Sequence, residues 1–251
     1  MATPDDKPSP SFERHRDVAD LKGKVVVVVG GSSGIGFAIA GSVVKAGATL
    51  AIVARDAARL RQAGKALGAA LTLRADVRQE MQTTRAFRVI GGHFGRIDAL
   101  VNSAGTFTYK PFERTTITDW RLNLDANLTS VFLATRAALP VLIKSQGQVV
   151  NILSISSRHA FANCSAYTAA KFGALGLTRV LAEELRPHGI RVSAIFPGAT
   201  NTRLVRAFGF AIEPERLVQP EDVAQAVLTV LMAPRHATIA EIVVTPSGGA
   251  L

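Results

Sequence analysis

A tyrosine and a lysine placed four residues apart, Tyr167 and Lys171, have the types and spacing to move a proton. On a helix this spacing places both side chains on one face, one turn apart. A phenol has an ordinary pKa of about 10, and a neighbouring ammonium group favours its ionised form. Such a tyrosine can pass a proton to or from a substrate oxygen. Taken alone, the spacing is common by chance, and a solvated tyrosine beside a lysine is the alternative.

A glycine-rich run is the second pattern with a chemical use. It follows the apolar run Val25–Val29 and spaces its glycines as GxxxGxG. Glycines let the backbone turn sharply and approach a pyrophosphate, and free N–H groups at a helix start attract the anion. A turn whose glycines serve packing alone is the alternative. The residues expected to contact the phosphates are Gly30, Ser32, Ser33, Gly34, Ile35 and Gly36.

These residues need a scaffold, and the chain alternates short apolar runs with longer segments of helical spacing. Strands are expected at 25–29, 50–53, 71–75, 97–101, 149–153, 192–196 and 239–244. Helices are expected at 34–46, 57–67, 79–94, 117–143, 162–186 and 221–232. Parallel strands need right-handed crossovers that cover both faces of a sheet. The pattern therefore predicts an α/β fold, a single-domain, Rossmann-like doubly wound parallel sheet of about seven strands with helices on both faces.

The composition of the 251 residues, 48% hydrophobic and 19% charged, is typical of a globular protein with a large core. We expect one domain over residues 21–251. Residues 1–20 carry three prolines and no apolar periodicity, which predicts a flexible N-terminal arm. The single cysteine excludes an internal disulfide, and the start of the chain does not read as a signal peptide, so a cytoplasmic location is expected. No membrane association is expected, because the apolar runs fall short of the roughly 20 residues of a span.

The formal net charge of +10 needs an explanation. Such an excess can indicate a nucleic-acid, membrane-surface or phosphorylated partner. The basic residues are scattered singly between apolar ones, without a basic run or interleaved aromatic residues, so we expect no nucleic-acid partner. No His, Cys and carboxylate cluster has the spacing of metal ligands, and we expect no metal.

Four motifs together carry a family resemblance. After the glycine turn come Asn102 to Gly105 behind the fourth strand, then Tyr167 to Lys171, then Pro197-Gly198 behind a later strand. With these motifs the chain from Lys24 to about Thr202 resembles the short-chain dehydrogenases/reductases. The closing helix and strand, near 220–224 and 241–244, are similar to those of the family as well.

The sequence departs from the family pattern at two positions. Val29 stands where a threonine usually precedes the first glycine, and Ser103 stands for the second asparagine of the Asn-Asn-Ala-Gly motif. Both positions mainly support a loop in the family. The departures therefore concern the fine geometry of the loops rather than activity.

The resemblance implies a catalytic site made of Asn127, Ser154, Tyr167 and Lys171. The family's serine lies thirteen residues before the tyrosine, which selects Ser154, and it holds the substrate oxygen. Asn127 would hold a water molecule that connects to the lysine. A buried amide without partners is costly, which favours a specific role, and a core asparagine that kinks its helix is the alternative.

The resemblance also implies further contacts with a dinucleotide. Asp76 and Val77 would meet the adenine ring, although a solvated aspartate at a strand end is the alternative for Asp76. Pro197, Gly198 and Thr202 would flank the nicotinamide carboxamide, although a proline can simply end a strand. The remaining residues expected to contact the cofactor are Asn102, Ala104, Gly105, Tyr167 and Lys171.

The end of the second strand predicts the choice of cofactor. Relatives that prefer NAD usually place an acid at the position of Ala54, where it accepts both ribose hydroxyl groups. The next residue, Arg55, stands where NADP-dependent relatives place a base, and a guanidinium group can bind a phosphate with two charge-assisted bonds. Asp56 follows and weakens the case unless it caps the next helix. NADP(H) is therefore the expected cofactor, with NAD(H) less favoured.

The implied activity is that of an oxidoreductase that interconverts a carbonyl and a secondary alcohol, as a ketone reductase or alcohol dehydrogenase does. A catalytically weak protein that only senses the nucleotide is the alternative. Residues 203–217 are expected to cover the substrate, and their apolar members favour an apolar or ring-containing small molecule: Leu204, Val205, Phe208, Phe210 and Ile212. Arg203 and Arg206 can bind a carboxylate group, so a substrate that carries one is not excluded by the sequence. The family also implies a homo-oligomer, a dimer or a tetramer.

Overall fold

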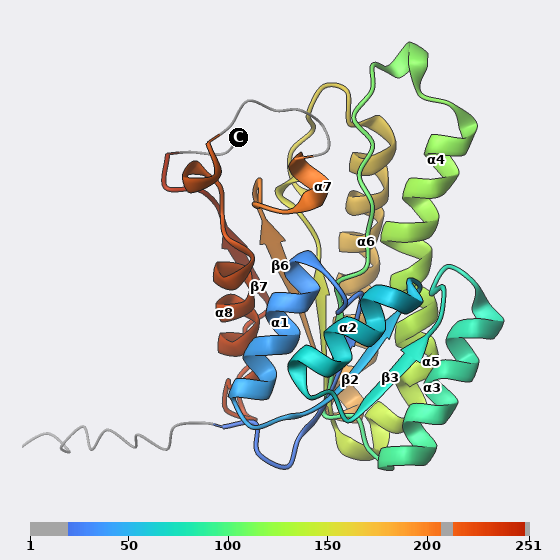
Figure 1. The fold of residues 1–251 in the computed structure, drawn as a ribbon, viewed down its shortest axis with the longest axis vertical. Coiled ribbons are helices and arrows are strands. Elements are labelled where there is room, and N and C mark those ends of the chain that lie inside the picture. The colour runs from blue at the N-terminus through green and yellow to red at the C-terminus, as the bar shows by residue number, and fades with distance from the viewer. Residues whose placement is uncertain (1–19, 207–212, 249–251) are drawn as a thin grey trace, which may run out of the picture.

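The computed structural model describes residues 20–206 and 213–248. In this part of the chain, parallel strands form a seven-stranded sheet in the order β3-β2-β1-β4-β5-β6-β7 (Figure 1). The strands are β1 Val25–Val29, β2 Thr49–Ala54, β3 Leu71–Arg74, β4 Ala99–Asn102, β5 Gln148–Ile152, β6 Arg191–Pro197 and β7 Glu241–Val244. Because the strand order turns back between β1 and β4, the loops after these two strands diverge, which is where doubly wound folds bind ligands.

Helices connect these strands and lie on both faces of the sheet (Figure 1). The helices are α1 Gly34–Lys45, α2 Ala57–Leu67, α3 Glu80–Phe94, α4 Ile117–Leu124, α5 Ser130–Ser145, α6 Ser165–Glu184, α7 Arg203–Arg206 and α8 Pro220–Leu231. The prediction of a doubly wound, Rossmann-like parallel sheet is confirmed.

The all-valine strand β1 explains how the core is divided. Alternate side chains of a strand point to opposite faces, so Val26 and Val28 pack among residues of α1, α2 and α8, whereas Val27 and Val29 pack among residues of α3 and α5. Every residue of β1 is buried. A strand buried on both faces needs a continuous apolar run rather than an alternating one, which is why the sequence identified it correctly.

Several element ends differ from those expected. Strand β4 reaches Asn102, because this residue still pairs with Val29 of β1. Helix α6 begins at Ser165 rather than near 162, since Asn163 has a left-handed backbone with a φ of 65° and cannot continue a right-handed helix.

The long helix expected at 117–143 is not a continuous α-helix. A π-helical turn, Asp125–Thr129, separates α4 from α5. Asn127 lies in this turn, and its Nδ2 donates to the carbonyl oxygen of Asn123 at 3.0 Å. Single π turns inside helices are frequent at functional sites, so the interruption is consistent with a special role for this segment.

The run Ile117–Ser145 is long and apolar enough to cross a membrane by length and composition, and an 18-residue window within it has a mean hydropathy of 1.5. Half of this window is buried inside the fold, and α5 packs against α3. The same run is therefore a helix of the core, where apolar side chains are needed for packing against the sheet.

Candidate active site

The glycine turn after β1 makes a backbone approach that no side chain would allow. Gly30 has a φ of +83°, and a Cβ atom on it would lie 2.7 Å from the backbone nitrogen of Ala104. A Cβ atom on Gly36 would lie 2.4 Å from the carbonyl oxygen of Gly30. The turn and the loop after β4 are thus in direct backbone contact, and glycine is required at both positions.

This turn fits a pyrophosphate. Gly34 begins α1, and the side chain of the preceding Ser33 makes no capping hydrogen bond, so it does not occupy the first N–H groups of the helix. Those groups carry the positive end of the helix dipole. Thr202 lies beside the same turn, because a Cβ atom on Gly34 would be 3.5 Å from its methyl carbon. Two of the predicted cofactor motifs, far apart in the sequence, therefore meet.

The predicted serine, tyrosine and lysine also come together. Ser154 follows β5 and is buried, and its hydroxyl group lies near enough to Tyr167 on α6 to lower the pKa of the phenol. One turn further along α6, Lys171 is buried with its Nζ atom 5.7 Å from the centre of the Tyr167 ring. The lysine donates a hydrogen bond of 3.0 Å to the carbonyl oxygen of Ile152. The three side chains thus form one cluster at the carboxyl end of β5.

Burial shifts the pKa values of this cluster in opposite senses. Burial raises the pKa of Tyr167 to about 12, while the nearby hydroxyl group of Ser154 acts in the other direction. Burial lowers the pKa of Lys171 to about 8, because the ammonium group loses its hydration. At neutral pH the tyrosine therefore holds its proton. It can donate that proton to an oxygen atom placed beside Ser154.

Asn127 is buried and is bonded to the loop after β4. Its Oδ1 atom accepts from the backbone N–H of Thr106 at 3.3 Å, and its Nδ2 atom donates to the carbonyl oxygen of the same residue at 3.0 Å. The asparagine therefore fixes the loop that begins at Gly105. The water-holding role remains a prediction.

A buried polar chain anchors the end of β4. The Nδ2 atom of Asn102 donates to the side chains of Thr135, at 3.2 Å, and Asn151, at 2.8 Å. Asn151 in turn donates to Thr178 of α6 at 2.9 Å. This chain links β4, β5 and α6, so the predicted cofactor residue Asn102 also helps to hold the helix that carries Tyr167.

The two residues expected at the adenine ring are held differently. The carboxylate of Asp76 binds the guanidinium group of Arg78 at 2.6 Å, and this hydrogen-bonded partner holds the pKa of Asp76 below its usual value. Val77 is buried and packs in the core on the face covered by α3 and α5. Asp76 is therefore an ion-paired residue rather than a solvated one.

Arg55 lies on the surface directly after β2. Its carbonyl oxygen accepts from Arg74 at 3.3 Å, and its guanidinium group makes no ion pair with any residue that the structure describes. Asp56 caps α2 by accepting from the N–H of Arg59 at 3.0 Å, which is the capping role weighed for it. A cleft of about 820 Å³ opens beside Arg55, and its lining includes Arg74, Asp76, Gln82 and Arg85.

The predicted motif after β6 lies at the same end of the sheet. Pro197 is the last residue of β6, and the N–H of Gly198 donates to Val244 of β7 at 2.8 Å. Helix α7 follows, with Leu204 exposed. Val205 of α7 is half-buried, and the remaining apolar residues expected to cover the substrate, Phe208, Phe210 and Ile212, lie outside the described residues.

Sequence reasoning missed one neighbour of the site. The ring of Phe107 meets the ring of Tyr167 edge to face, with centroids 4.8 Å apart and an interplanar angle of 79°. Phe107 lies in the run Thr-Phe-Thr-Tyr-Lys, in which polar and aromatic residues alternate, and that alternation was the available signal. Among residues 20–206 and 213–248, no group of three or more His, Cys, Asp or Glu side chains could hold a metal ion.

Comparison with known proteins finds relatives that match most of the chain. An uncharacterised oxidoreductase of Staphylococcus epidermidis is 31% identical over 231 residues, covering 91% of this chain and 100% of the relative. One of Staphylococcus saprophyticus is 30% identical over 235 residues, covering 91% of this chain and 100% of the relative.

Two solved structures share the fold. A metagenomic short-chain oxidoreductase in complex with NADP is 31% identical, with a TM-score of 0.78 and coverage of 90% of this chain and 98% of that one. An alcohol dehydrogenase from the archaeon Thermococcus sibiricus, complexed with 5-hydroxy-NADP, has a TM-score of 0.83 at 24% identity, covering 91% of this chain and 98% of that one. The family model for short chain dehydrogenases matches residues 24–210. The chain therefore belongs to the short-chain dehydrogenase family.

Proposed function

We propose that this oxidoreductase uses NADP(H) to interconvert a carbonyl and a secondary alcohol, with Ser154, Tyr167, Lys171 and Asn127 as its catalytic site. The observation that carries the proposal is the cluster in which Tyr167 lies beside the buried Lys171, with its ring centre 5.7 Å from Nζ, and near the hydroxyl group of Ser154. A protein that only senses a nucleotide has no need to bury a lysine beside a tyrosine, because such burial costs stability.

Each side chain has a role in the proposed reaction. The hydroxyl groups of Ser154 and Tyr167 hold the carbonyl oxygen, and Tyr167 donates its proton to that oxygen as the alcohol forms. Lys171 favours the tyrosinate left behind, and Asn127 holds a water molecule that returns a proton. Bound NADP(H) would supply the hydride for the carbonyl carbon or accept it in the reverse direction.

The residues proposed to hold the cofactor fit its parts. The turn from Gly30 to Gly36 takes the pyrophosphate, and Asn102, Ala104 and Gly105 border it after β4. Pro197, Gly198 and Thr202 flank the nicotinamide carboxamide. Asp76 and Val77 meet the adenine ring, and the ion pair of Asp76 with Arg78 holds its carboxylate in one orientation.

Two observations support the preference for NADP(H). The guanidinium group of Arg55 makes no hydrogen bond or ion pair with the described residues, and Arg55 borders a cleft that Arg74 and Arg85 also line. A phosphate on the ribose would find positive charge there. A short-chain oxidoreductase that is 31% identical was solved in complex with NADP.

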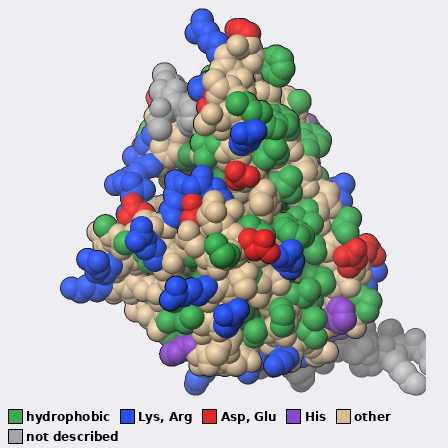
Figure 2. Space-filling model, turned by 90° about the vertical axis from the view of Figure 1, so that its right-hand side faces the viewer, with side chains coloured by type: hydrophobic (Ala, Val, Ile, Leu, Met, Phe, Trp, Pro, Cys, Tyr) green, Lys and Arg blue, Asp and Glu red, His purple; other side chains and the backbone are tan. Residues whose placement is uncertain are grey.

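A homo-oligomer, a dimer or a tetramer, is part of the proposal, as is a cytoplasmic location. Large apolar side chains stay exposed along α4 and α5, namely Trp120, Phe132 and Ile143. Figure 2 shows hydrophobic side chains in a band over the face on which α4 and α5 lie. Covering such a band with a second copy of the chain would remove apolar surface from water.

The first test removes the proposed proton donor. Tyr167→Phe should keep the fold and the affinity for NADPH but lower turnover by roughly 10²–10⁴, the range of general acid–base catalysis. Turnover is measured with a panel of ketones through the loss of NADPH absorbance. Near-wild-type turnover in the purified variant would exclude this role for Tyr167.

The second test concerns the cost of burying Lys171. Its pKa is lowered to about 8 in the folded protein, so from pH 8 to about 10.5 the unfolded chain binds more protons, and stability rises with pH. Lys171→Met lacks this dependence. The free energy of unfolding of wild type relative to Lys171→Met should rise by on the order of 1–3 kcal/mol between pH 7 and pH 10. Urea unfolding of both proteins at pH 7 and pH 10 measures this difference in the free energy of unfolding. If the difference is the same at both pH values, Lys171 is not a buried lysine with a lowered pKa.

The third test concerns cofactor choice. A hydrogen bond to a charged group contributes roughly 1.5–3 kcal/mol, so Arg55→Ala should weaken NADPH binding by about 10- to 150-fold and NADH binding little. Arg88→Ala, which removes an exposed arginine outside the cleft, is the matched control and should affect both cofactors little. Equal losses for NADPH and NADH in Arg55→Ala, or equal affinity of wild type for the two, would show that Arg55 does not select the cofactor.

A further inference from the structure

The segment Thr106 to Lys110, between β4 and α4, has no regular secondary structure but is tightly held. Every second residue of this segment is hydrogen-bonded to a side chain of α4 or of the π turn. The residues that supply these side chains are four apart in the sequence and therefore lie on one face of the helix. The fastened pairs are Thr106 with Asn127 at 3.0 Å, Thr108 with Asn123 at 2.7 Å, and Lys110 with Asp119 at 2.8 Å. The alternation leaves Phe107 and Tyr109 to face the other way.

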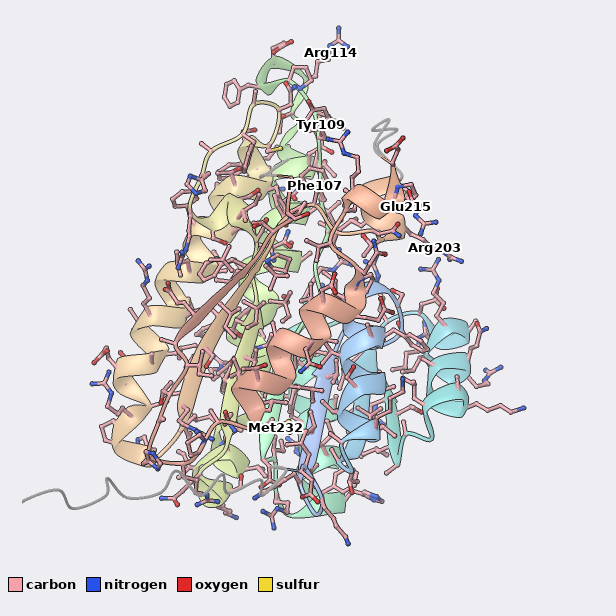
Figure 3. All side chains as sticks on the ribbon, turned by 90° about the vertical axis from the view of Figure 1, so that its left-hand side faces the viewer. Phe107, Tyr109, Arg114, Arg203, Glu215 and Met232 are labelled. Carbon is pink, nitrogen blue, oxygen red and sulfur yellow. The ribbon has the colours of Figure 1, made fainter. Side chains whose placement is uncertain are left out.

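Both aromatic residues lie on the side of the catalytic helix. The ring of Phe107 is 4.8 Å from the ring of Tyr167, and the ring of Tyr109 is 6.3 Å from that of Phe107 at an angle of 37°. Figure 3 shows the two labelled residues one above the other, at the end of the molecule that carries α7. Two rings in succession thus lead away from Tyr167.

A second clamp fixes these rings relative to α6. Asn163 has a left-handed backbone just before α6. Its Nδ2 atom donates to the hydroxyl group of Tyr109 at 3.1 Å, and its carbonyl oxygen accepts from the N–H of Lys110 at 2.8 Å. The same residue therefore ties the aromatic pair to the helix that carries the proton donor.

A purely structural role, in which the two rings hold Tyr167 in place, does not explain why Tyr109 is held as well. Phe107 already packs on the Tyr167 ring, whereas Tyr109 is 38% exposed although its position is fixed from two sides. Lys110, the cation of this segment, is bound by Asp119, so the segment itself adds no unpaired charge beside the two rings. A fixed aromatic surface suits a flat, uncharged ring, which it can bind in stacked or edge-to-face geometry.

We propose that Phe107 and Tyr109 form an aromatic wall of the substrate site and select carbonyl compounds that carry a neutral, planar ring near the reacting carbon. The proposal deepens the proposed function, because it rests on Tyr167 acting at the carbonyl oxygen. This aromatic wall lies in the segment after β4. It is separate from residues 203–217, which the sequence predicts to cover the substrate.

The test uses two ketones of equal size that differ in the ring alone, 1-phenyl-2-propanone and 1-cyclohexyl-2-propanone. Wild type should reduce the phenyl compound with the higher kcat/KM. Phe107→Leu and Tyr109→Leu should each lower the phenyl-to-cyclohexyl ratio by roughly two- to tenfold, the size of one aromatic pair. Tyr109→Phe keeps the ring and should keep the ratio. Phe132→Leu, on the exposed side of α5, is the matched control and should leave the ratio unchanged.

A binding measurement separates this proposal from the proposed function. The product alcohols, 1-phenyl-2-propanol and 1-cyclohexyl-2-propanol, cannot react with NADPH, so calorimetric titration of the NADPH-loaded protein reports affinity alone. If wild type prefers the phenyl alcohol and both Leu variants lose that preference, the wall stands even if no ketone is reduced, and the catalytic assignment fails instead. If the phenyl-to-cyclohexyl ratio of kcat/KM is the same in wild type and both Leu variants, or if neither alcohol binds, Phe107 and Tyr109 do not form a wall of the substrate site.

Discussion

The arrangement of the site depends on a backbone contact that only glycine permits, between the turn after β1 and the loop after β4. With a Cβ atom on Gly30 placed 2.7 Å from the nitrogen of Ala104, any larger residue would push the two loops apart. The first loop leads to the amino end of α1, where a phosphate is expected to bind. The second leads through Gly105 to Thr106, Asn127 and Phe107. A single close approach therefore helps to set the distance between the turn proposed to bind a phosphate and the residues proposed to act at the substrate oxygen.

The second constraint is electrostatic. Lys171 is buried with its Nζ atom on a backbone carbonyl oxygen, and burial lowers its pKa to about 8 while that of Tyr167 rises to about 12. Stability alone would favour an apolar residue at position 171. A charge kept at this cost beside a tyrosine is understandable if the ion changes the proton affinity of the phenol when a substrate is present. The chain of Asn102, Asn151 and Thr178 keeps α6 in register for that purpose.

The sequence was informative where local pattern and burial agree. The continuous valines of β1 and the turn from Gly30 to Gly36 predicted the strand and the start of the following helix correctly, because each depends on neighbours along the chain. The four-residue spacing predicted that Tyr167 and Lys171 share one face of a helix, whereas the choice of Ser154 as their neighbour followed from a family resemblance. What could not be predicted depends on contacts between distant segments. The π turn at Asn127 is held by Thr106, and the ring of Phe107 meets Tyr167 only after folding.

We propose that the glycine turn and Tyr167 belong to one site. A cofactor bound at the turn would then place its positively charged nicotinamide ring close to the phenol. The chain has two tyrosines, so ultraviolet titration of tyrosinate absorbance can follow Tyr167 against the background of Tyr109. Without cofactor, the pKa of about 12 keeps Tyr167 protonated up to pH 10. Saturating NADP⁺ is expected to produce an additional tyrosinate signal between pH 7 and 10 in wild type and not in Tyr167→Phe. A titration curve that NADP⁺ leaves unchanged, although the protein binds it, would show that the nicotinamide ring and Tyr167 do not share one site.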